Sequence, residues 1–281
     1  MSRHLRRKAF GWLMFALTAA CALLSLSVLF YILGYIFAKG CSSLSWSFLV
    51  HLPKPAGELG GGIANSIVGS IKIVGLASLA GIPIGVLGGV YLSEFGSGRL
   101  GFLIRYASDI LNGVPSIVTG LFAYAVVVEP MKSFSGLAGS VALAIIMIPI
   151  VLRSAEDFLR LVPQTIREAA LALGVPQWKV ILRIVIPSAA RGIVTASLLA
   201  MARIAGETAP LLFTSFGNSF WDSGWLNPMA ALPHTIFIYA ISPYDDLHRQ
   251  AWAAALVLMA FVLAVNVGSR LLLRPSSATP R

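Results

Sequence analysis

The amino-acid sequence predicts an all-α, polytopic membrane protein with six transmembrane helices. Hydrophobic residues make up 57% of its 281 residues and charged residues only 11%, and the mean hydropathy is +0.84. Soluble proteins carry about 25% charged residues, so a soluble globular enzyme is excluded. Because one bilayer crossing needs about 20 apolar residues, the chain has room for about six crossings and their loops.

The first predicted span is the apolar run at 10–38, which follows a short basic segment at 1–9. The run is longer than the roughly 7–15 apolar residues of a secretory signal peptide. We therefore expect it to remain as a transmembrane helix behind a cytoplasmic basic N-terminus. A polar loop with several Gly and Pro residues follows it at 39–62.

Five further apolar runs predict a transmembrane domain at 63–273. The runs are 63–92, 106–128, 136–152, 189–216 and 251–273. The longest polar stretch between spans, 153–188, separates the fourth run from the fifth, and a short tail follows at 274–281. Prolines interrupt four of the runs, as is typical of helices that line a cavity or pack on protein.

The run at 63–92 carries small residues at four-residue intervals, and this spacing predicts close packing against another helix. The small residues are Ala77, Gly81, Gly85 and Gly89. Residues four apart lie on one helix face, so this face has no bulky side chain and a second helix can approach it closely.

The distribution of Lys and Arg predicts the orientation. Six spans place both termini and the 153–188 loop on one side, which then carries 15 of the 21 basic residues, against four on the other side. The positive-inside rule assigns the basic side to the cytoplasm. We therefore expect a multi-pass protein of the plasma (inner) membrane with both termini cytoplasmic. Topology explains the net charge of +10 without a nucleic-acid partner.

No chemical motif in the sequence indicates catalysis. The chain lacks a Gly-Lys-Ser or Gly-Lys-Thr phosphate loop, its four histidines have no metal-ligand spacing, and no Ser, His and acid set suggests a nucleophile. Cys21 and Cys41 stand about 30 Å apart along one helix, too far for a disulfide. We expect no catalytic, cofactor or metal site here, so the energy source is an ion gradient or another protein.

Within the cytoplasmic loop, the segment 163–176 predicts a short helix with defined ends. Thr165 and Glu168 have the spacing of a capping box, and Gly174 followed by Pro176 predicts a left-handed turn that ends the helix. The apolar residues fall on one face, which in the cytosol needs a partner. They are Ile166, Ala169, Ala170 and Leu173.

This segment resembles the EAA motif in the permease subunits of binding-protein-dependent ABC importers, which have the type I, MetI-like fold. The matching residues are Glu168, Ala169, Ala170, Gly174, Ile184 and Pro187. Ile186 stands where leucine is usual, which is a conservative difference. In that family the motif forms a coupling helix that docks on a separate ATPase subunit, and the resemblance implies the same role here. A helix cap alone also explains Glu168, so both explanations remain open.

Two further segments, 109–121 and 203–212, resemble the phosphate-specific permeases of this family. The resemblance implies import of inorganic phosphate along a path that includes Arg203, Glu207 and Thr208. It also implies a homologous permease chain, a pair of ATPase subunits and an extracytoplasmic phosphate-binding protein as partners. ATP and Mg would then bind to the ATPase and not to this chain.

Arg203 lies near the middle of the run at 189–216, where a basic side chain costs roughly 2.5–3.5 kcal/mol on insertion scales. Glu207 follows one helical turn later and is an available partner. Two explanations stay open: a neutralising pair that joins helices, or an Arg that offers its planar donor fork to an oxyanion in the path. Lys72 is a weaker candidate because its long stem can reach the headgroups.

Three alternative functions also fit the sequence. The chain could import another oxyanion such as sulfate, molybdate or phosphonate, or it could be a secondary transporter with Arg203 and Glu207 as an ion relay. It could also be a membrane sensor of phosphate status. The cytosolic helix with an unpaired apolar face favours a pump subunit over a secondary transporter.

Overall fold

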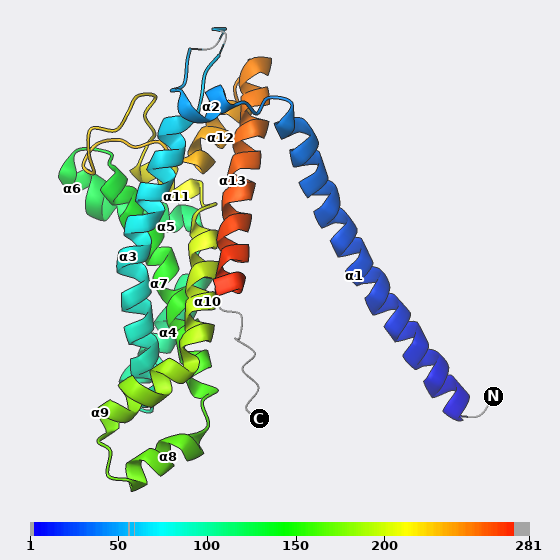
Figure 1. Cartoon of the computed structure of the whole chain (residues 1–281), viewed down its shortest axis with the longest axis vertical. Helices are drawn as coiled ribbons and strands as arrows, with labels where there is room; N and C mark the ends of the chain where they lie inside the picture. The colour runs from blue at the N-terminus through cyan, green and yellow to red at the C-terminus, as the bar shows by residue number, and fades with distance from the viewer. Residues whose placement is uncertain (1–2, 56, 59, 273–281) are drawn as a thin grey trace.

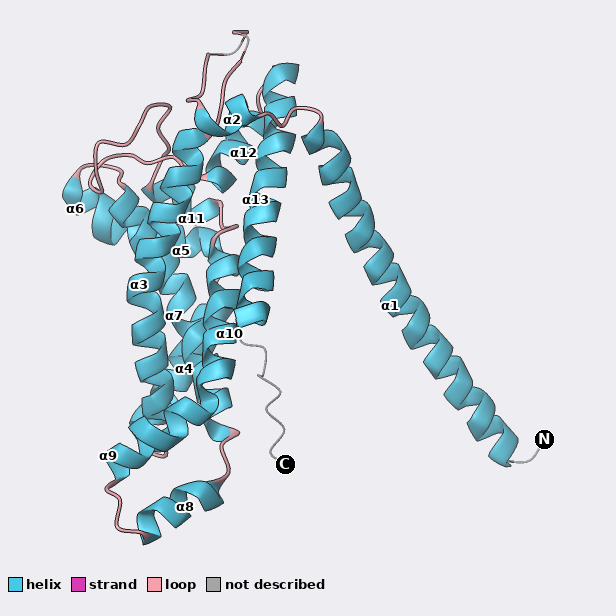
Figure 2. Ribbon diagram, viewed as in Figure 1, coloured by secondary structure: helices cyan, strands magenta, loops and turns pink. Residues whose placement is uncertain are grey.

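The computed structural model describes residues 3–55, 57–58 and 60–272, so the expected tail at 274–281 lies outside them. These residues form helices joined by loops (Figure 2). Five of the helices are long and apolar enough to cross a membrane, and a bent pair of helices supplies a sixth crossing when it counts as one span. The structure therefore agrees with the predicted all-α class.

The first long helix, α1 (Arg3–Cys41), contains the predicted span at 10–38 and reaches back into the basic segment. It leans away from the other helices and meets them only near its C-terminal end (Figure 1). There Gly40 lies against α13 (Asp245–Leu272) so closely that a Cβ would be 2.8 Å from the Cβ of Leu256. Nearly all of the α1 surface is open in the single chain, so lipid or another subunit must cover it.

The centre of the fold is the packed pair of α3 (Ala64–Glu94) and α7 (Gly136–Arg160). A Cβ added at Gly89 would lie 2.6 Å from the Cβ of Ala155, and one at Gly85 would meet α7 almost as closely, at 2.7 Å. Real side chains do not approach so closely, so these positions need glycine. The predicted packing role of the small residues is confirmed.

The third span, predicted at 106–128, is sharply bent at Pro115, one of the prolines that interrupt the predicted runs. The chain forms α4 (Arg99–Gly113), turns by 106°, and continues from Ser116 to Met131. The second arm consists of α5 (Ser116–Ala123), a π-helical turn η1 (Tyr124–Val128) and α6 (Glu129–Met131). Pro115 causes the bend because it pushes the preceding residue, Val114, into an extended conformation.

The fifth span also differs from the predicted run at 189–216. A continuous helix already begins at Gln177 and ends at Ile204. Its parts are α9 (Gln177–Val180), a π-helical turn η2 (Ile181–Val185) and α10 (Ile186–Ile204). The backbone then leaves the helix before α11 (Ala209–Thr214) begins. Pro210 in the first turn of α11 has no amide hydrogen, so the helix cannot continue through it.

Two ends of the molecule can be distinguished. At one end, the α12 end, lie α2 (Trp46–Val50) and α12 (Leu232–Ala240). At the other, the α8 end, lie α8 (Gln164–Ala172) and the start of α1 (Figure 1). The last helix, α13 (Asp245–Leu272), starts slightly before the predicted sixth span. Likewise, α7 continues past residue 152 into the predicted loop.

Apolar clusters join the helices at three levels. Their fully or nearly fully buried members include Met147 and Ile204 in the middle, Leu159 and Val185 at the α8 end, and Ile63 and Leu232 at the α12 end. Burial of such side chains supplies about 1.5–3 kcal/mol each in water. Within a bilayer, close packing rather than exclusion of water holds such contacts together.

The glycine face of α3 generates a testable prediction. Gly89→Leu forces α3 and α7 apart and should cost at least about 1–3 kcal/mol of stability. Gly75→Leu is the matched control, because a Cβ at Gly75 meets nothing within 4 Å. Thermal unfolding of the purified, detergent-solubilised protein measures both. Equal melting temperatures for the two variants would contradict the packing described here.

Candidate functional site

The C-terminal end of α8 has the geometry that the sequence predicts. Gly174 adopts a left-handed φ of 77°. Its amide donates to the carbonyl of Leu171 at 2.9 Å, and the amide of Val175 donates to the carbonyl of Ala170 at 3.3 Å. These bonds satisfy the last free carbonyls of the helix. The predicted turn at Gly174 is confirmed.

The N-terminal end of α8 differs from the prediction. The helix starts at Gln164 with Pro163 as its cap residue, and no side chain caps it. Thr165 is therefore already inside the first turn, so the capping box with Glu168 does not form. The Glu168 side chain is exposed and bonds to none of the described residues. A cap consequently no longer explains this carboxylate.

The apolar face of α8 is only partly covered. Ala170 is buried in the apolar cluster at the α8 end, where Ile184 also packs. In contrast, Leu173 is 84% exposed and Ile166 is 43% exposed. Pro187, the last residue of the motif, is exposed at the start of α10. The motif thus joins Ala170 and Ile184 in one cluster and leaves an apolar surface open beside them.

The predicted Arg203–Glu207 pair does not have the expected geometry. Arg203 stands in the last turn of α10, and Glu207 lies in the non-helical segment after Ile204, so the two do not share a helix face. Neither side chain has a hydrogen bond or ion pair to the described residues. Arg203 instead lines a shallow cavity of about 350 Å³ between α7 and α10. Thr208 accepts the amide hydrogen of Leu211 and so starts α11.

Lys72 has a specific partner in the fold. Its Nζ lies 2.8 Å from both carboxylate oxygens of Asp222, a residue in the loop between α11 and α12. The aspartate side chain is 13% exposed. Since the two residues are far apart in sequence, neither the pair nor its orientation is visible in a local pattern.

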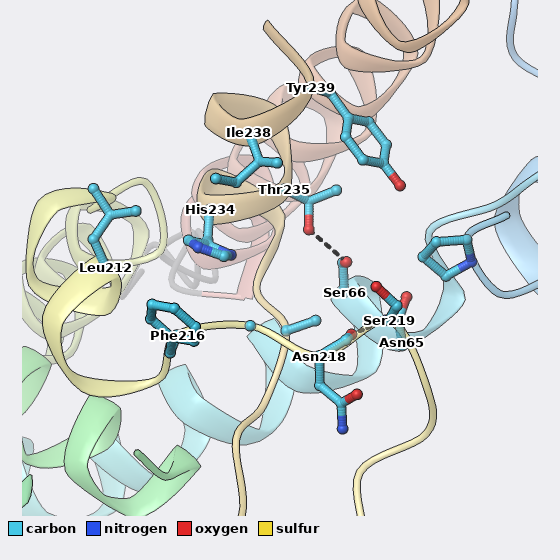
Figure 3. A pocket seen from close by; sticks show the side chains of 13 residues that line it. Asn65, Ser66, Leu212, Phe216, Asn218, Ser219, His234, Thr235, Ile238 and Tyr239 are labelled. Carbon is cyan, nitrogen blue, oxygen red and sulfur yellow. Dashed lines mark hydrogen bonds between the residues drawn. The ribbon is translucent and has the colours of Figure 1, made fainter. Parts of the chain in front are cut away.

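A second cavity, of about 380 Å³, lies at the α12 end (Figure 3). It was not predicted from the sequence. Ser66 and Thr235 hydrogen-bond across it at 2.7 Å, and the buried Oδ1 of Asn65 has no partner among the described residues. Burial lowers the pKa of His234, which lies outside the membrane-crossing helices. The left-handed Gly217 is essential here, because a Cβ would lie 2.5 Å from the His234 ring. The one sequence signal for this cavity was that polar residues, Asn65 and Ser66, stand at the start of the apolar run at 63–92.

Charged side chains converge on Glu156 at the α8 end. Glu156 is fully buried, and its oxygens lie 2.7 Å from Arg105, 3.0 Å from Arg153 and 2.7 Å from Arg160. Arg105 also donates to backbone carbonyls at the end of α3. The cluster therefore ties α4, α7 and the C-terminal end of α3 together.

Comparison with known proteins identifies the family. The model of the family "Binding-protein-dependent transport system inner membrane component" matches residues 81–274. The chain belongs to this family. It is 43% identical to the phosphate transport system permease protein PstA of Yersinia pestis, over 95% of this chain and 93% of that protein. It is 44% identical to the PstA of Haemophilus influenzae, over 94% of each chain.

Solved structures support the same fold. A chain of the inward-facing MetNI methionine ABC transporter aligns with a TM-score of 0.65 at 16% identity, over 75% of this chain and 94% of that one. A chain of a bacterial alginate ABC transporter aligns with a TM-score of 0.67 at 13% identity, over the whole of both chains. At such low identity these structures show the MetI-like fold alone.

The buried cluster generates a second prediction. Glu156→Gln removes the single carboxylate that three arginines share, which should destabilise the protein by about 3–5 kcal/mol. The control is Asp157→Asn, one residue further along α7, because Asp157 is exposed. Folded yield and melting temperature after purification test the difference. A Glu156→Gln protein as stable as the control would contradict a structural role for the cluster.

Proposed function

We propose that the chain is the transmembrane permease subunit of an ATP-driven importer of inorganic phosphate. The observation that carries this proposal is 43–44% identity to PstA permeases along nearly the whole chain. In this assignment the chain forms part of the translocation path and couples it to an ATPase on a separate chain. It has no catalytic role of its own.

The orientation follows from charge. The α8 end carries the basic loops and the buried arginine cluster, so the positive-inside rule places it in the cytoplasm together with both termini. The α12 end then faces the extracytoplasmic side of the inner membrane. In a chain with Cys21 and Cys41 replaced by Ser, impermeant thiol labelling of Gln177→Cys should therefore require permeabilised cells, whereas labelling of intact cells would contradict this orientation.

The partners follow from the family and from the open surface of α8. A homologous permease of the PstC type would complete the path, and an extracytoplasmic binding protein of the PstS type would deliver phosphate. A pair of PstB-type ATPases, which carry the ATP and Mg, would dock on α8. The exposed Leu173 and the unpaired Glu168 suit such a dock, because an apolar side chain and a free carboxylate both gain from a protein surface.

Arg203 is the proposed anion-binding residue of the path, with Glu207 and Thr208 beside it. An arginine within a membrane protein usually faces a partner or an aqueous cavity. Here Arg203 lines a cavity and has no carboxylate partner among the described residues, which favours the path over the neutralising pair. The nearby break at 205–208 exposes backbone groups that can also contact a substrate.

Uptake by the purified complex tests the proposed function. The four kinds of subunit are reconstituted in vesicles, and ATP-dependent entry of radiolabelled phosphate is measured. Excess sulfate, molybdate or phosphonate should not reduce entry. Competition by one of these would assign another oxyanion. Uptake that needs an ion gradient but no ATP would make the chain a secondary transporter, and no uptake in any condition would favour a sensor.

Arg203 provides a further prediction. Arg203→Lys keeps the charge but loses the planar donor fork, so uptake per assembled complex should fall about tenfold, the equivalent of one charged hydrogen bond. Arg191→Lys, at an exposed position on the same helix, is the control and should transport normally. If Arg203→Lys also transports normally, Arg203 does not bind the anion through its fork.

Gly174 also provides a prediction. Gly174→Val places a β-branched residue in a left-handed conformation, at a cost of roughly 1–2 kcal/mol, and should deform α8. Membrane abundance should persist, while co-purification of the ATPase falls. Gly174→Asn is the matched control, because Asn tolerates this conformation. Normal ATPase binding by Gly174→Val would show that the motif does not carry the dock.

A further inference from the structure

The helix α8 is connected to α3 by a nearly buried ion pair. Arg167 Nη2 lies 3.1 Å from Glu94 Oε1, and the two side chains are only 13% and 7% exposed. The same Nη2 donates to the carbonyl of Leu159 at 2.7 Å, and Ser93 donates to the same carboxylate oxygen at 3.2 Å. One guanidinium therefore joins α8, the last turn of α7 and the last turn of α3.

This contact is not a tightly packed one. Arg167 Nε is buried and has no hydrogen-bond partner in the part of the chain that the structure describes. A cavity of about 150 Å³ lies beside the pair, and both polar residues, such as Gln164 and Gln177, and apolar ones line it. Apolar packing holds two helices together at least as well as a buried ion pair does. Holding α8 against α3 therefore does not require this ion pair. A charged pair, however, fixes the relative orientation of the two helices.

The pair stands where α8 can act on the rest of the molecule. Figure 1 shows α8 set off from the bundle, with a loop on each side. Besides the ion pair, its buried anchor is Ala170. Glu94 is the last residue of α3, and side chains of α7 pack directly against the backbone of α3 at Gly85 and Gly89. A displacement of α8 would thus be passed to the end of α3 and, through α3, to the packed α3–α7 pair.

We propose that the Arg167–Glu94 ion pair is the joint that transmits movement of α8 to the α3–α7 pair, with Arg167 and Glu94 as positioning residues for coupling. The inference rests on the proposed function, because α8 must first be moved by an ATPase. It goes further by naming the contact through which that movement enters the transmembrane helices.

The test compares phosphate taken up per ATP hydrolysed in the complete reconstituted complex. Arg167→Gln and Glu94→Gln should each leave the ATPase bound and hydrolysing at a rate within twofold of wild type. The uptake per ATP should fall about tenfold. The double variant with Glu94→Arg and Arg167→Glu restores an ion pair and should regain most of the coupling. The control is Arg99→Gln, an exposed arginine that follows α3 closely in sequence.

Three results would overturn the joint. The first is unchanged uptake per ATP in both single variants. The second is a parallel loss of ATPase binding and hydrolysis, which would mean that the ion pair only anchors α8. The third is a double variant no better coupled than the single ones.

A second readout does not depend on phosphate. In a chain with Cys21 and Cys41 replaced by Ser, the modification rate of Ser219→Cys in the cavity at the α12 end should change with ATP. Arg167→Gln should abolish this change, and persistence of the change would overturn the joint. A wild-type complex that shows this change but imports no phosphate would refute the proposed function while the joint stands.

Discussion

The close packing of α3 on α7 is the constraint on which the rest of the structure depends. At Gly85 and Gly89 the two helices approach so closely that not even a methyl group fits between them. Sliding or rotating either helix would require side chains to pass through each other, so the pair behaves as one solid element. The Glu156 cluster attaches α4 to its α8 end, and apolar contacts attach α10 along its middle.

The helices that follow the two breaks, α5 and α11, pack against each other in the fold. A Cβ at Gly120, in the arm after the Pro115 bend, would lie 2.7 Å from the Cα of Pro210, just after the break at 205–208. In a bilayer, non-helical backbone is tolerated only where protein or a water-filled cavity surrounds it. Residues 113, 115 and 206 in these breaks are exposed in the single chain, so another subunit or a water-filled path must surround them, and Arg203 lies beside a cavity near the second break.

The sequence predicted features that depend on local spacing and missed those that depend on distant contacts. The spans, the glycine face of α3 and the left-handed Gly174 follow from periodicity and from the conformational freedom of glycine. The Arg203–Glu207 geometry failed because both residues were expected on one helix face, whereas α10 ends at Ile204, between them. The Lys72–Asp222 pair joins residues that are widely separated in the chain, and no local pattern records such a contact.

The central claim is that α8, α3 and α7 form one mechanical unit in an ATP-driven permease. The most direct measurement is the distance between spin labels on Ala172 in α8 and on Leu87 in α3, both exposed positions, in the assembled complex with and without ATP. The account predicts that this distance stays constant while the Ala172 label moves relative to the corresponding helix of the partner permease. An Ala172–Leu87 distance that changes as much as the distance between subunits would contradict it.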